Sequence, residues 1–375
     1  MKKVAIITSF PRAHRVGVYN EMAKDNRYEF NVFYLRSMPH GRHWEYGPKL
    51  KHNHKLIKEL RIWKHLYLSP RLLREFVDYN PDMMIMTQYA SPGMQLLMYY
   101  CSIRKIPWVF WSEAPNVRYE APFVKNELLR TILRKIAMLP IKYFAKEVWG
   151  IGNRAIDEYK EEFGLNKIYK NLPYYSDLRE FSKAGGLRKN DIPPTFLFSG
   201  SLSYRKGADL FAKSIESLAK KGYEFHVIVM GVGEFSNKLT DLKSFRNIEI
   251  DLLGFVQLDK VPEVYSKANI LVFPSRHDGW GMTLPEGMAA GMAVISTPYT
   301  GCAIDTINDN MNGVLVNTVT SSELEKAMES LINHPTEVAR MGEAAKRTIS
   351  SYTHIAGAKK FNSMINKFLR SYSAL

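Results

Sequence analysis

The chain has 375 residues, of which 46% are hydrophobic, and its formal net charge is +15. This length accommodates two domains with a core each, and the apolar content is ordinary for a soluble protein. The two cysteines, Cys101 and Cys302, lie far apart, which excludes a disulfide framework and favours a reducing compartment. No stretch approaches the ~18 apolar residues of a membrane span, so we expect a cytoplasmic protein.

Short apolar runs alternate with helical patterns in the first half of the chain. The predicted strands are residues 4–8, 29–35, 82–87, 108–111 and 147–151. The predicted helices between them are residues 18–25, 71–79 and 93–103. Because strands that alternate with helices form a parallel, doubly wound sheet, the pattern predicts an α/β domain over residues 1–172.

Polar residues follow two of these predicted strands. The loop over residues 9–17 carries Arg12 and Arg15, and Glu113 follows the strand over residues 108–111. The two arginines are candidates for contact with an anionic substrate, although solvent exposure explains them equally well. Glu113 is a candidate for binding a substrate hydroxyl or accepting its proton. The alternative for Glu113 is a helix cap or an ion pair.

Basic residues concentrate in residues 36–74 and again in residues 125–146. Apolar residues recur at intervals of three and four in the second cluster, which predicts an amphipathic helix. Its basic members are Lys125, Arg130, Arg134, Lys135, Lys142 and Lys146, and its apolar members are Leu128, Leu129, Ile132, Leu133 and Ile136. Nucleic acid, a solvated basic face and an anionic membrane surface are three alternatives for these clusters. The sequence lacks zinc-ligand spacing and RNP-like segments, which argues against nucleic acid.

The second half repeats the alternation after an irregular segment over residues 184–194. The predicted strands are residues 195–199, 225–230, 248–252, 270–273 and 292–295. The predicted helices are residues 208–220, 261–268, 322–332 and 355–369, with a short helix inside residues 283–291. The pattern predicts a second doubly wound domain over residues 173–375.

A loop rich in glycine, residues 278–283, joins the predicted strand over residues 270–273 to the short helix. Thr283 is a plausible cap, and Pro285 suits the first turn of the helix. A strand–helix–strand unit opens its loop at the carboxyl edge of the sheet, where backbone N–H groups and the helix dipole favour a diphosphate. Glu286, one turn into the helix, can accept hydrogen bonds from sugar hydroxyls.

The spacing Asp278-x7-Glu286, followed by Gly-Met-Ala-Ala-Gly, resembles the E-x7-E signature of family-4 (group 1) retaining glycosyltransferases. Residues 200–207, Gly-Ser-Leu-Ser-Tyr-Arg-Lys-Gly, resemble that family's G-R-L-x3-K-G loop. Asp278 replaces the usual Glu, and Ser201 stands at the Arg position. The resemblance implies a GT-B fold, with two doubly wound Rossmann-like domains facing a central cleft and a final helix, about residues 355–375, that packs back on the first domain.

The resemblance also implies roles for single residues. Donor-binding roles fall on Gly17, Ser201, Gly231, Phe255, Val256, Gly279, Trp280, Gly281, Met282, Thr283 and Glu286. Catalytic roles fall on Glu113, Arg205, Lys206 and Asp278, with Arg205 supplying the charge that Ser201 lacks. Acceptor-binding roles fall on Arg12 and Arg15, because the first domain binds the acceptor in this family.

The implied function is transfer of a sugar from a nucleotide sugar, UDP-sugar more readily than GDP-sugar, with retention of configuration. The implied acceptor is a glycan or a lipid-linked glycan of bacterial-type surface polysaccharide or lipopolysaccharide synthesis at the inner face of the cytoplasmic membrane. We expect no metal to be required, since Arg205 and Lys206 can replace its charge. Two alternatives stay open, an inverting GT-B enzyme with Glu113 as base and a non-catalytic sugar-binding protein.

Overall fold

The computed structural model describes residues 1–37, 49–63, 66–115, 126–187, 193–316 and 320–372. The chain divides into two compact units, residues 1–176 with 353–375 and residues 177–352. The chain therefore passes from the first unit to the second after Ser176, whereas the sequence predicted this boundary after Leu172. Among the described residues, no helix combines the length and the apolar character that crossing a bilayer requires.

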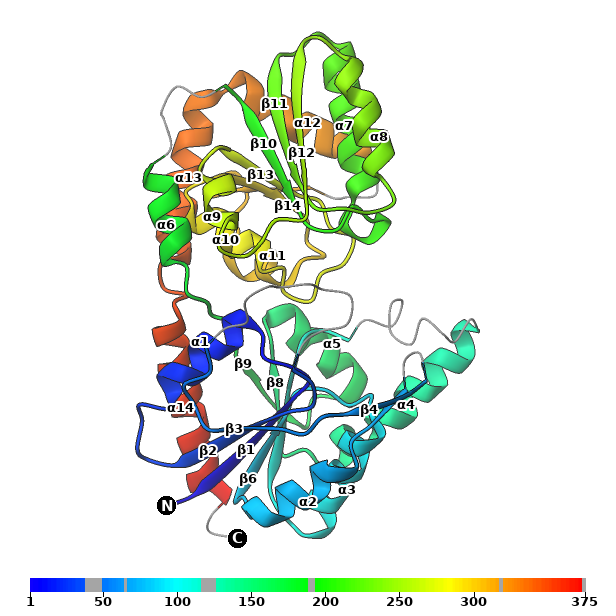
Figure 1. Ribbon diagram of the computed structural model, residues 1–375, viewed down its shortest axis with the longest axis vertical. Helices are drawn as coiled ribbons and strands as arrows, with labels where there is room; N and C mark the ends of the chain where they lie inside the picture. Colours follow the sequence, from blue (N-terminus) through cyan, green and yellow to red (C-terminus); the bar gives the residue numbers. More distant parts are fainter. Residues whose placement is uncertain (38–48, 64–65, 116–125, 188–192, 317–319, 373–375) are drawn as a thin grey trace. The chain divides into compact units, whose positions relative to one another are not determined.

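The first unit is built on a seven-stranded sheet in the order β3-β2-β1-β6-β7-β8-β9 (Figure 1). Its strands are β1 (Lys3–Thr8), β2 (Glu29–Tyr34), β3 (His54–Leu56), β6 (Met83–Met86), β7 (Trp108–Ser112), β8 (Glu147–Gly150) and β9 (Ile168–Asn171). Neighbouring strands pair in parallel. The central strands β1, β6 and β8 are almost wholly buried, as expected for a parallel sheet with helices on both faces.

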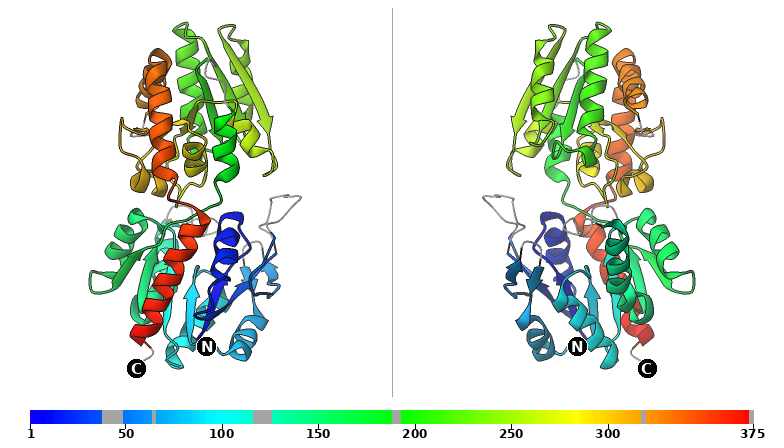
Figure 2. Two further views of the ribbon diagram at one scale, coloured as in Figure 1. Left: turned by 90° about the vertical axis from the view of Figure 1, so that its left-hand side faces the viewer. Right: turned by 90° about the vertical axis from the view of Figure 1, so that its right-hand side faces the viewer.

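The helices of the first unit are α1 (Ala13–Met22), α2 (Pro70–Tyr79), α3 (Pro92–Ile103), α4 (Glu127–Phe144), α5 (Asn153–Phe163) and α14 (His354–Tyr372). A short antiparallel pair, β4 (Leu60–Trp63) and β5 (Leu66–Leu68), accompanies them. Although α14 follows the second unit in the sequence, it lies alongside α1 in the first unit (Figure 2). Phe361 of α14 packs edge-on against Trp111, with ring centroids 4.9 Å apart.

Some local predictions for the first unit were wrong. The loop predicted over residues 9–17 ends early, because α1 begins at Ala13. Gly17 therefore lies inside α1, where a Cβ atom would lie 3.6 Å from the Cβ atom of His354. The strands β3, β4, β5 and β9 were missed, since such short strands show too little apolar alternation to be recognised. Part of the basic cluster over residues 36–74 lies outside the described residues.

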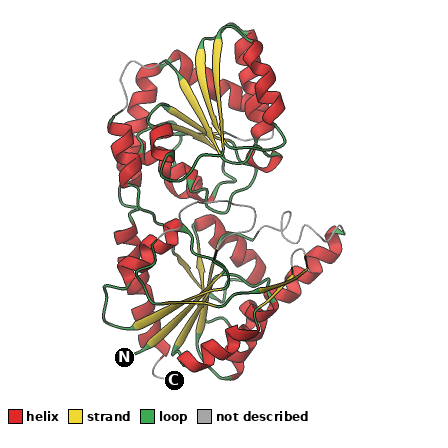
Figure 3. Cartoon of the chain, viewed as in Figure 1, coloured by secondary structure: helices red, strands yellow, loops and turns green. Residues whose placement is uncertain are grey.

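The second unit contains a six-stranded sheet in the order β12-β11-β10-β13-β14-β15. Its strands are β10 (Thr195–Ser199), β11 (Phe225–Met230), β12 (Ile248–Gly254), β13 (Ile270–Phe273), β14 (Ala293–Ser296) and β15 (Val314–Leu315). The bounds predicted for β10, β11 and β13 are confirmed. Figure 3 shows helices on both sides of each sheet, so the strands lie in the middle layer of their unit.

The helices of the second unit are α6 (Arg179–Gly186), α7 (Ala208–Lys220), α8 (Ser236–Asp241), α9 (Val261–Tyr265), α10 (Thr283–Ala289), α11 (Gly301–Thr306), α12 (Ser321–Asn333) and α13 (Pro335–Ile349). Two 3-10 turns are η1 (Tyr204–Lys206) and η2 (Leu242–Ser244). The bounds predicted for α7 are confirmed. The start of the segment predicted to be irregular, residues 184–194, belongs instead to α6.

The strand order places a topological switch point in the second unit between β10 and β13. From β10 the chain moves to β11 and β12 on one side, and then returns to β13 on the other. At such a point the connections after the two central strands lead to opposite sides of the sheet, and ligands bind outside the carboxyl ends of these strands. The loops after β10 and β13 are the two that carry the residues of the predicted donor site.

Candidate functional site

The loops that follow β10 and β13 touch each other through their backbones. Gly207, between η1 and α7, has a φ angle of 74°, which favours glycine. A Cβ atom at this position would lie 2.1 Å from the carbonyl oxygen of Pro274. The absence of a side chain at Gly207 thus allows the Arg205-Lys206 turn to lie directly against the start of the Asp278 loop.

Lys206, Arg205 and Asp278 come together at this contact. The Lys206 ammonium donates a hydrogen bond to Oδ2 of Asp278, and it lies 4.5 Å from the ring centroid of Phe273. Nη1 of Arg205 lies 3.5 Å from the same Asp278 oxygen and donates to the carbonyl oxygen of His277 at 2.8 Å. The three predicted catalytic residues of the second unit therefore form one cluster.

The charge of Asp278 follows from this cluster. Burial by itself would raise the pKa of Asp278, but the nearby charges of Lys206 and Arg205 outweigh that effect, and its pKa lies below the usual value. Asp278 is therefore ionised at neutral pH. An ammonium has three N–H donors and a guanidinium five, so both cations can bond a further anion while they contact Asp278.

A second ion pair, which the sequence reasoning missed, braces the same turn. Arg276 binds Asp209, in the first turn of α7, through two hydrogen bonds of 2.6 and 2.8 Å. Its guanidinium also lies over the Tyr204 ring, 3.7 Å from the centroid. The sequence offered one indication that Arg276 belongs to the site, its position two residues before Asp278. Nothing in the sequence identified Asp209 as the partner of Arg276.

The predicted phosphate loop runs from Asp278 into α10. Gly281 and Met282 precede the helix, and Met282 stands at its N-cap without a side-chain cap hydrogen bond, so the prediction that Thr283 caps the helix was wrong. Trp280 is buried and stacks on Tyr352 at a centroid distance of 6.3 Å. Since its ring is part of the packing, Trp280 can contact a ligand only through its backbone, as Gly279 and Gly281 must.

Glu286 lies one turn into α10, partly buried, and the hydroxyl of Tyr265 donates to its Oε2 at 3.4 Å. Burial raises the pKa of Glu286 to about 8, although the Tyr265 hydrogen bond acts in the opposite direction. Glu286 therefore holds a proton at neutral pH. Sequence reasoning placed Glu286 correctly on the helix but could identify neither its proton nor Tyr265.

The remaining predicted donor-binding residues lie at the carboxyl ends of β10, β11 and β12. Gly231 follows β11 with a φ angle of 143°, and a Cβ atom there would lie 1.9 Å from the carbonyl oxygen of Gly200. The hydroxyls of Ser201 and Ser203 lie 3.2 Å apart. Phe255 and Val256 directly follow β12. These residues thus share the sheet edge that carries Lys206 and Asp278.

The first unit brings Glu113 together with Arg12 and Tyr174. The carboxylate of Glu113 accepts a hydrogen bond of 2.8 Å from the Tyr174 hydroxyl, and Nη1 of Arg12 lies 3.7 Å from it. The Glu113 carbonyl oxygen accepts a bond of 2.7 Å from the Tyr159 hydroxyl. Sequence reasoning missed Tyr174, because it belongs to the linker-like stretch Asn-Leu-Pro-Tyr-Tyr and carries no motif.

Arg15 lies in the interior of the first unit rather than on its surface. Its guanidinium donates to the Thr8 hydroxyl at 2.9 Å and to the Tyr174 hydroxyl at 2.5 Å. It also lies 4.7 Å from the ring centroid of Trp111. The acceptor contacts of Arg12 and Arg15 stay predictions, whereas the chain of contacts from Arg15 through Tyr174 to Glu113 is a feature of the structure.

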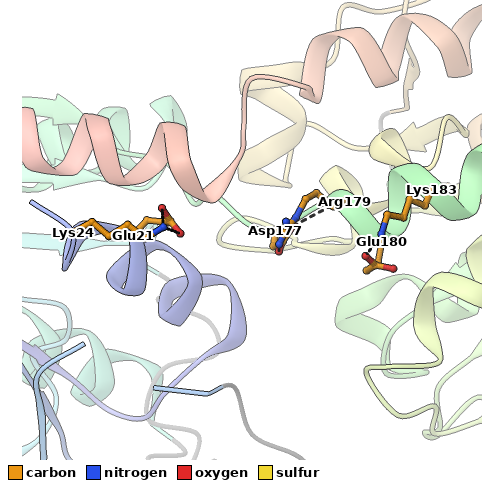
Figure 4. A network of polar contacts seen from close by, with 6 residues as sticks. All are labelled: Glu21, Lys24, Asp177, Arg179, Glu180 and Lys183. Atoms are coloured by element: carbon orange, nitrogen blue, oxygen red, sulfur yellow. Dashed lines mark hydrogen bonds and ion pairs between the residues drawn. The ribbon is translucent and has the colours of Figure 1, made fainter. Parts of the chain in front are cut away.

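Other charged groups lie apart from these clusters. Among the described residues, His226, Glu249 and Asp251 have ligand atoms within 4.8 Å of one another, close enough to share a metal ion. They lie on β11 and β12, with His226 near the amino end of β11. Figure 4 shows exposed ion pairs, Lys24 with Glu21 at 2.7 Å and Lys183 with Glu180 at 2.8 Å. Exposed pairs of this kind contribute little to stability and mark no site.

The comparison with known families agrees with this geometry. The family described as Glycosyl transferases group 1 matches residues 181–348, which lie within the second unit. The second unit belongs to this family. The chain therefore carries the domain of an enzyme family, as the motifs at residues 200–207 and 278–286 predicted.

Curated relatives of this group 1 glycosyltransferase domain include an uncharacterized glycosyltransferase of Methanocaldococcus jannaschii. It is 30% identical over 40% of this chain and 41% of its own length. A GalNAc-GalNAc-diNAcBac-PP-undecaprenol alpha-1,4-N-acetyl-D-galactosaminyltransferase of Campylobacter jejuni is 29% identical over 44% of this chain and 45% of its own. The chain thus spans less than half the length of these two relatives.

The solved structures extend the likeness to both units. HepE of Anabaena, crystallised in complex with UDP, has a TM-score of 0.71 to this structure and is 15% identical. The match covers 98% of this chain and 100% of HepE. At this identity the likeness establishes the fold. The protein has the GT-B fold, with a group 1 glycosyltransferase domain as its second unit.

Proposed function

We propose that the protein transfers a sugar from a nucleotide sugar to a glycan or lipid-linked acceptor, with retention of configuration. The observation that carries this proposal is the cluster of Lys206, Arg205 and Asp278 at the switch point of the second unit. When the bond between the sugar and the diphosphate breaks, negative charge grows on the departing diphosphate. Cations already fixed at that place stabilise the transition state more than the bound donor, and so raise the rate.

The residues around the cluster have separate roles in this proposal. Lys206 and Arg205 hold the diphosphate together with the backbone N–H groups of residues 279–283. Asp278 binds a hydroxyl of the donor sugar, and Glu286 binds the ribose hydroxyls. No metal is required, because the two cations supply the charge that a metal would supply. A UDP-sugar is the favoured donor, since HepE, which has the same fold, was crystallised with UDP.

Glu113 of the first unit binds the acceptor hydroxyl, with Tyr174 and Arg12 holding its carboxylate. The hydroxyl oxygen forms the new bond to the sugar, the electron pair of the broken bond departs with the diphosphate, and the proton of the hydroxyl passes to an oxygen of that diphosphate. The Campylobacter jejuni relative acts on an undecaprenol-linked glycan, as its name states, which favours a lipid-linked acceptor of surface polysaccharide or lipopolysaccharide synthesis. Such an acceptor places the reaction in the cytoplasm, at the inner face of the membrane.

Thermal unfolding in the presence of UDP-glucose, GDP-glucose and ADP-glucose tests the donor. We expect UDP-glucose to raise the melting temperature most, with or without EDTA, and to do so less in Lys206→Ala. If none of the three nucleotide sugars raises the melting temperature, the proposal is wrong. Release of UDP by hydrolysis of the donor would distinguish an enzyme from a sugar-binding protein. The anomeric configuration of the product would distinguish retention from inversion with Glu113 as base.

A further inference from the structure

Helix α4 of the first unit presents apolar side chains on the face that points away from its own unit. The buried residues Met138 and Ile141 form the packed face, together with Ala145 just after the helix. On the opposite face, residues 129, 132, 136, 139 and 143 follow one another at intervals of three and four, and so share a stripe along the helix. Ile136 and Tyr143 of this stripe are 55% and 65% exposed. Figure 1 shows the first turns of α4 reaching away from the body of its unit.

The neighbouring helix α3 continues this apolar surface. Tyr99 and Ile103, four residues apart on α3, are both exposed, and Ile103 is 78% exposed. The Tyr99 ring lies edge-on to Phe144, the last residue of α4, with centroids 6.3 Å apart. We call Tyr99 and Ile103 of α3 and Leu129, Ile132, Ile136 and Tyr143 of α4 the α3/α4 surface.

Exposed cations border the α3/α4 surface. Lys135 and Lys142, seven residues apart, lie along one flank of the stripe on α4. Arg104 and Lys105 directly follow Ile103 at the end of α3, and both are exposed. Within α4 the single acidic residue is Glu127. The border of the surface is therefore basic on both helices.

One cation that the sequence suggested for surface binding serves another purpose. Arg134 is buried and pairs with Glu162 at 2.9 Å, so it belongs to the packing of the first unit. Lys125 lies outside the described residues. Lys135 and Lys142 are the exposed cations of α4 that flank the apolar stripe.

We propose that the α3/α4 surface docks on the interface of a lipid bilayer that contains anionic lipid. A helix with an apolar stripe and a basic flank lies in the plane of such an interface, with its apolar side chains in the acyl boundary. Long Lys side chains reach the head groups, and Tyr143 suits the boundary because its ring is apolar and its hydroxyl is polar. A second copy of this chain is the poorer occupant, since it would bring the same cations into contact. The surface lies wholly in the first unit and is independent of the donor chemistry proposed for the second.

Co-sedimentation of the full chain with vesicles tests this proposal. One set of vesicles is pure phosphatidylcholine, and the other contains phosphatidylglycerol as well. We expect binding to the anionic vesicles that falls at high salt, because surface charges are screened. Ile132→Ser with Ile136→Ser should weaken it at least about tenfold, and Lys135→Gln with Lys142→Gln about 25-fold, at roughly fivefold for each cation near anionic lipid.

Matched variants control for apolar side chains and for charge. Leu165→Ser removes an apolar side chain that is 80% exposed elsewhere in the first unit, and Lys213→Gln with Lys260→Gln removes exposed charges from the second unit. These variants should bind as the wild type does, and thermal unfolding verifies that every variant is folded. Equal binding to both kinds of vesicle, or none, overturns the proposal. A concentration-dependent dimer that Ile132→Ser with Ile136→Ser abolishes also overturns it, in favour of a second copy.

Discussion

The raised pKa of Glu286 should make the proposed nucleotide binding depend on pH in a direction that can be predicted. At neutral pH Glu286 is protonated, because burial raises its pKa to about 8. If the carboxylate accepts hydrogen bonds from the ribose hydroxyls, the complex favours the ionised form. The affinity for UDP should then rise as the pH rises through the range in which Glu286 loses its proton. The substitution Glu286→Gln keeps the shape of the side chain and removes this titration.

The magnitude follows from the strength of the hydrogen bonds. Hydrogen bonds to charged groups contribute roughly 1.5–3 kcal/mol and those between neutral groups roughly 0.5–1.5 kcal/mol. Ionisation of Glu286 should therefore strengthen binding by about 1.4 kcal/mol, which corresponds to about tenfold in the dissociation constant. We expect Glu286→Gln to bind UDP about as tightly as the wild type near pH 7, and about tenfold more weakly near pH 9.

Isothermal titration calorimetry of UDP at pH 7, 8 and 9 measures this effect in both proteins. A UDP analogue without ribose 2′ and 3′ hydroxyls is the control ligand, and its affinity should not follow the ionisation of Glu286. Burial also lowers the pKa of Lys167, in the first unit, to about 8, so the Gln variant is needed to assign the pH dependence. If Glu286→Gln and the wild type show the same pH profile, Glu286 does not bind the ribose.

Three further predictions concern the cations, the first unit and stability. Lys206→Ala and Arg205→Ala should each lower kcat for UDP-sugar hydrolysis by about 10²–10³-fold and weaken UDP binding less, since the charge of these side chains matters most as the bond breaks. Wild-type turnover in Arg205→Ala would show that Arg205 does not face the diphosphate. Tyr174→Phe removes a hydrogen-bond acceptor from the buried Arg15 guanidinium and a donor from the partly exposed Glu113 carboxylate. It should lower the free energy of unfolding by roughly 1–3 kcal/mol in urea titrations, and an unchanged midpoint would contradict this. Folding raises the pKa of Glu286, so the folded protein is more stable with Glu286 protonated than with Glu286 ionised. This contribution to the free energy of unfolding is complete below the unfolded pKa and is lost as pH rises towards about 8. The melting temperature of the wild type should therefore fall relative to Glu286→Gln over that range, and a constant difference between the two would refute the raised pKa.

The sequence by itself determined the elements that are long or strongly patterned, and which candidate site residues of the second unit lie at the carboxyl edge of its sheet. The apolar runs of β10, β11 and β13 and the helix α7 have the predicted bounds, because their patterns are local and bounded by glycine or proline. The spacing from Asp278 to Glu286 predicted a strand, a loop and a helix, and the structure has them. Parallel strands end at the same edge of a sheet, so that Lys206 and Asp278 could be expected there.

Only the tertiary structure decided which partners these side chains have. Arg15 is buried against Tyr174, a residue far away in the sequence, and Arg276 is braced by Asp209 of another element. The helix α4 shows the limit most clearly. Its apolar residues lie on two opposite faces, and the periodicity alone cannot tell which face packs on the sheet. That choice depends on the shape of the neighbouring elements, and it leaves Ile136 exposed while Met138 is buried.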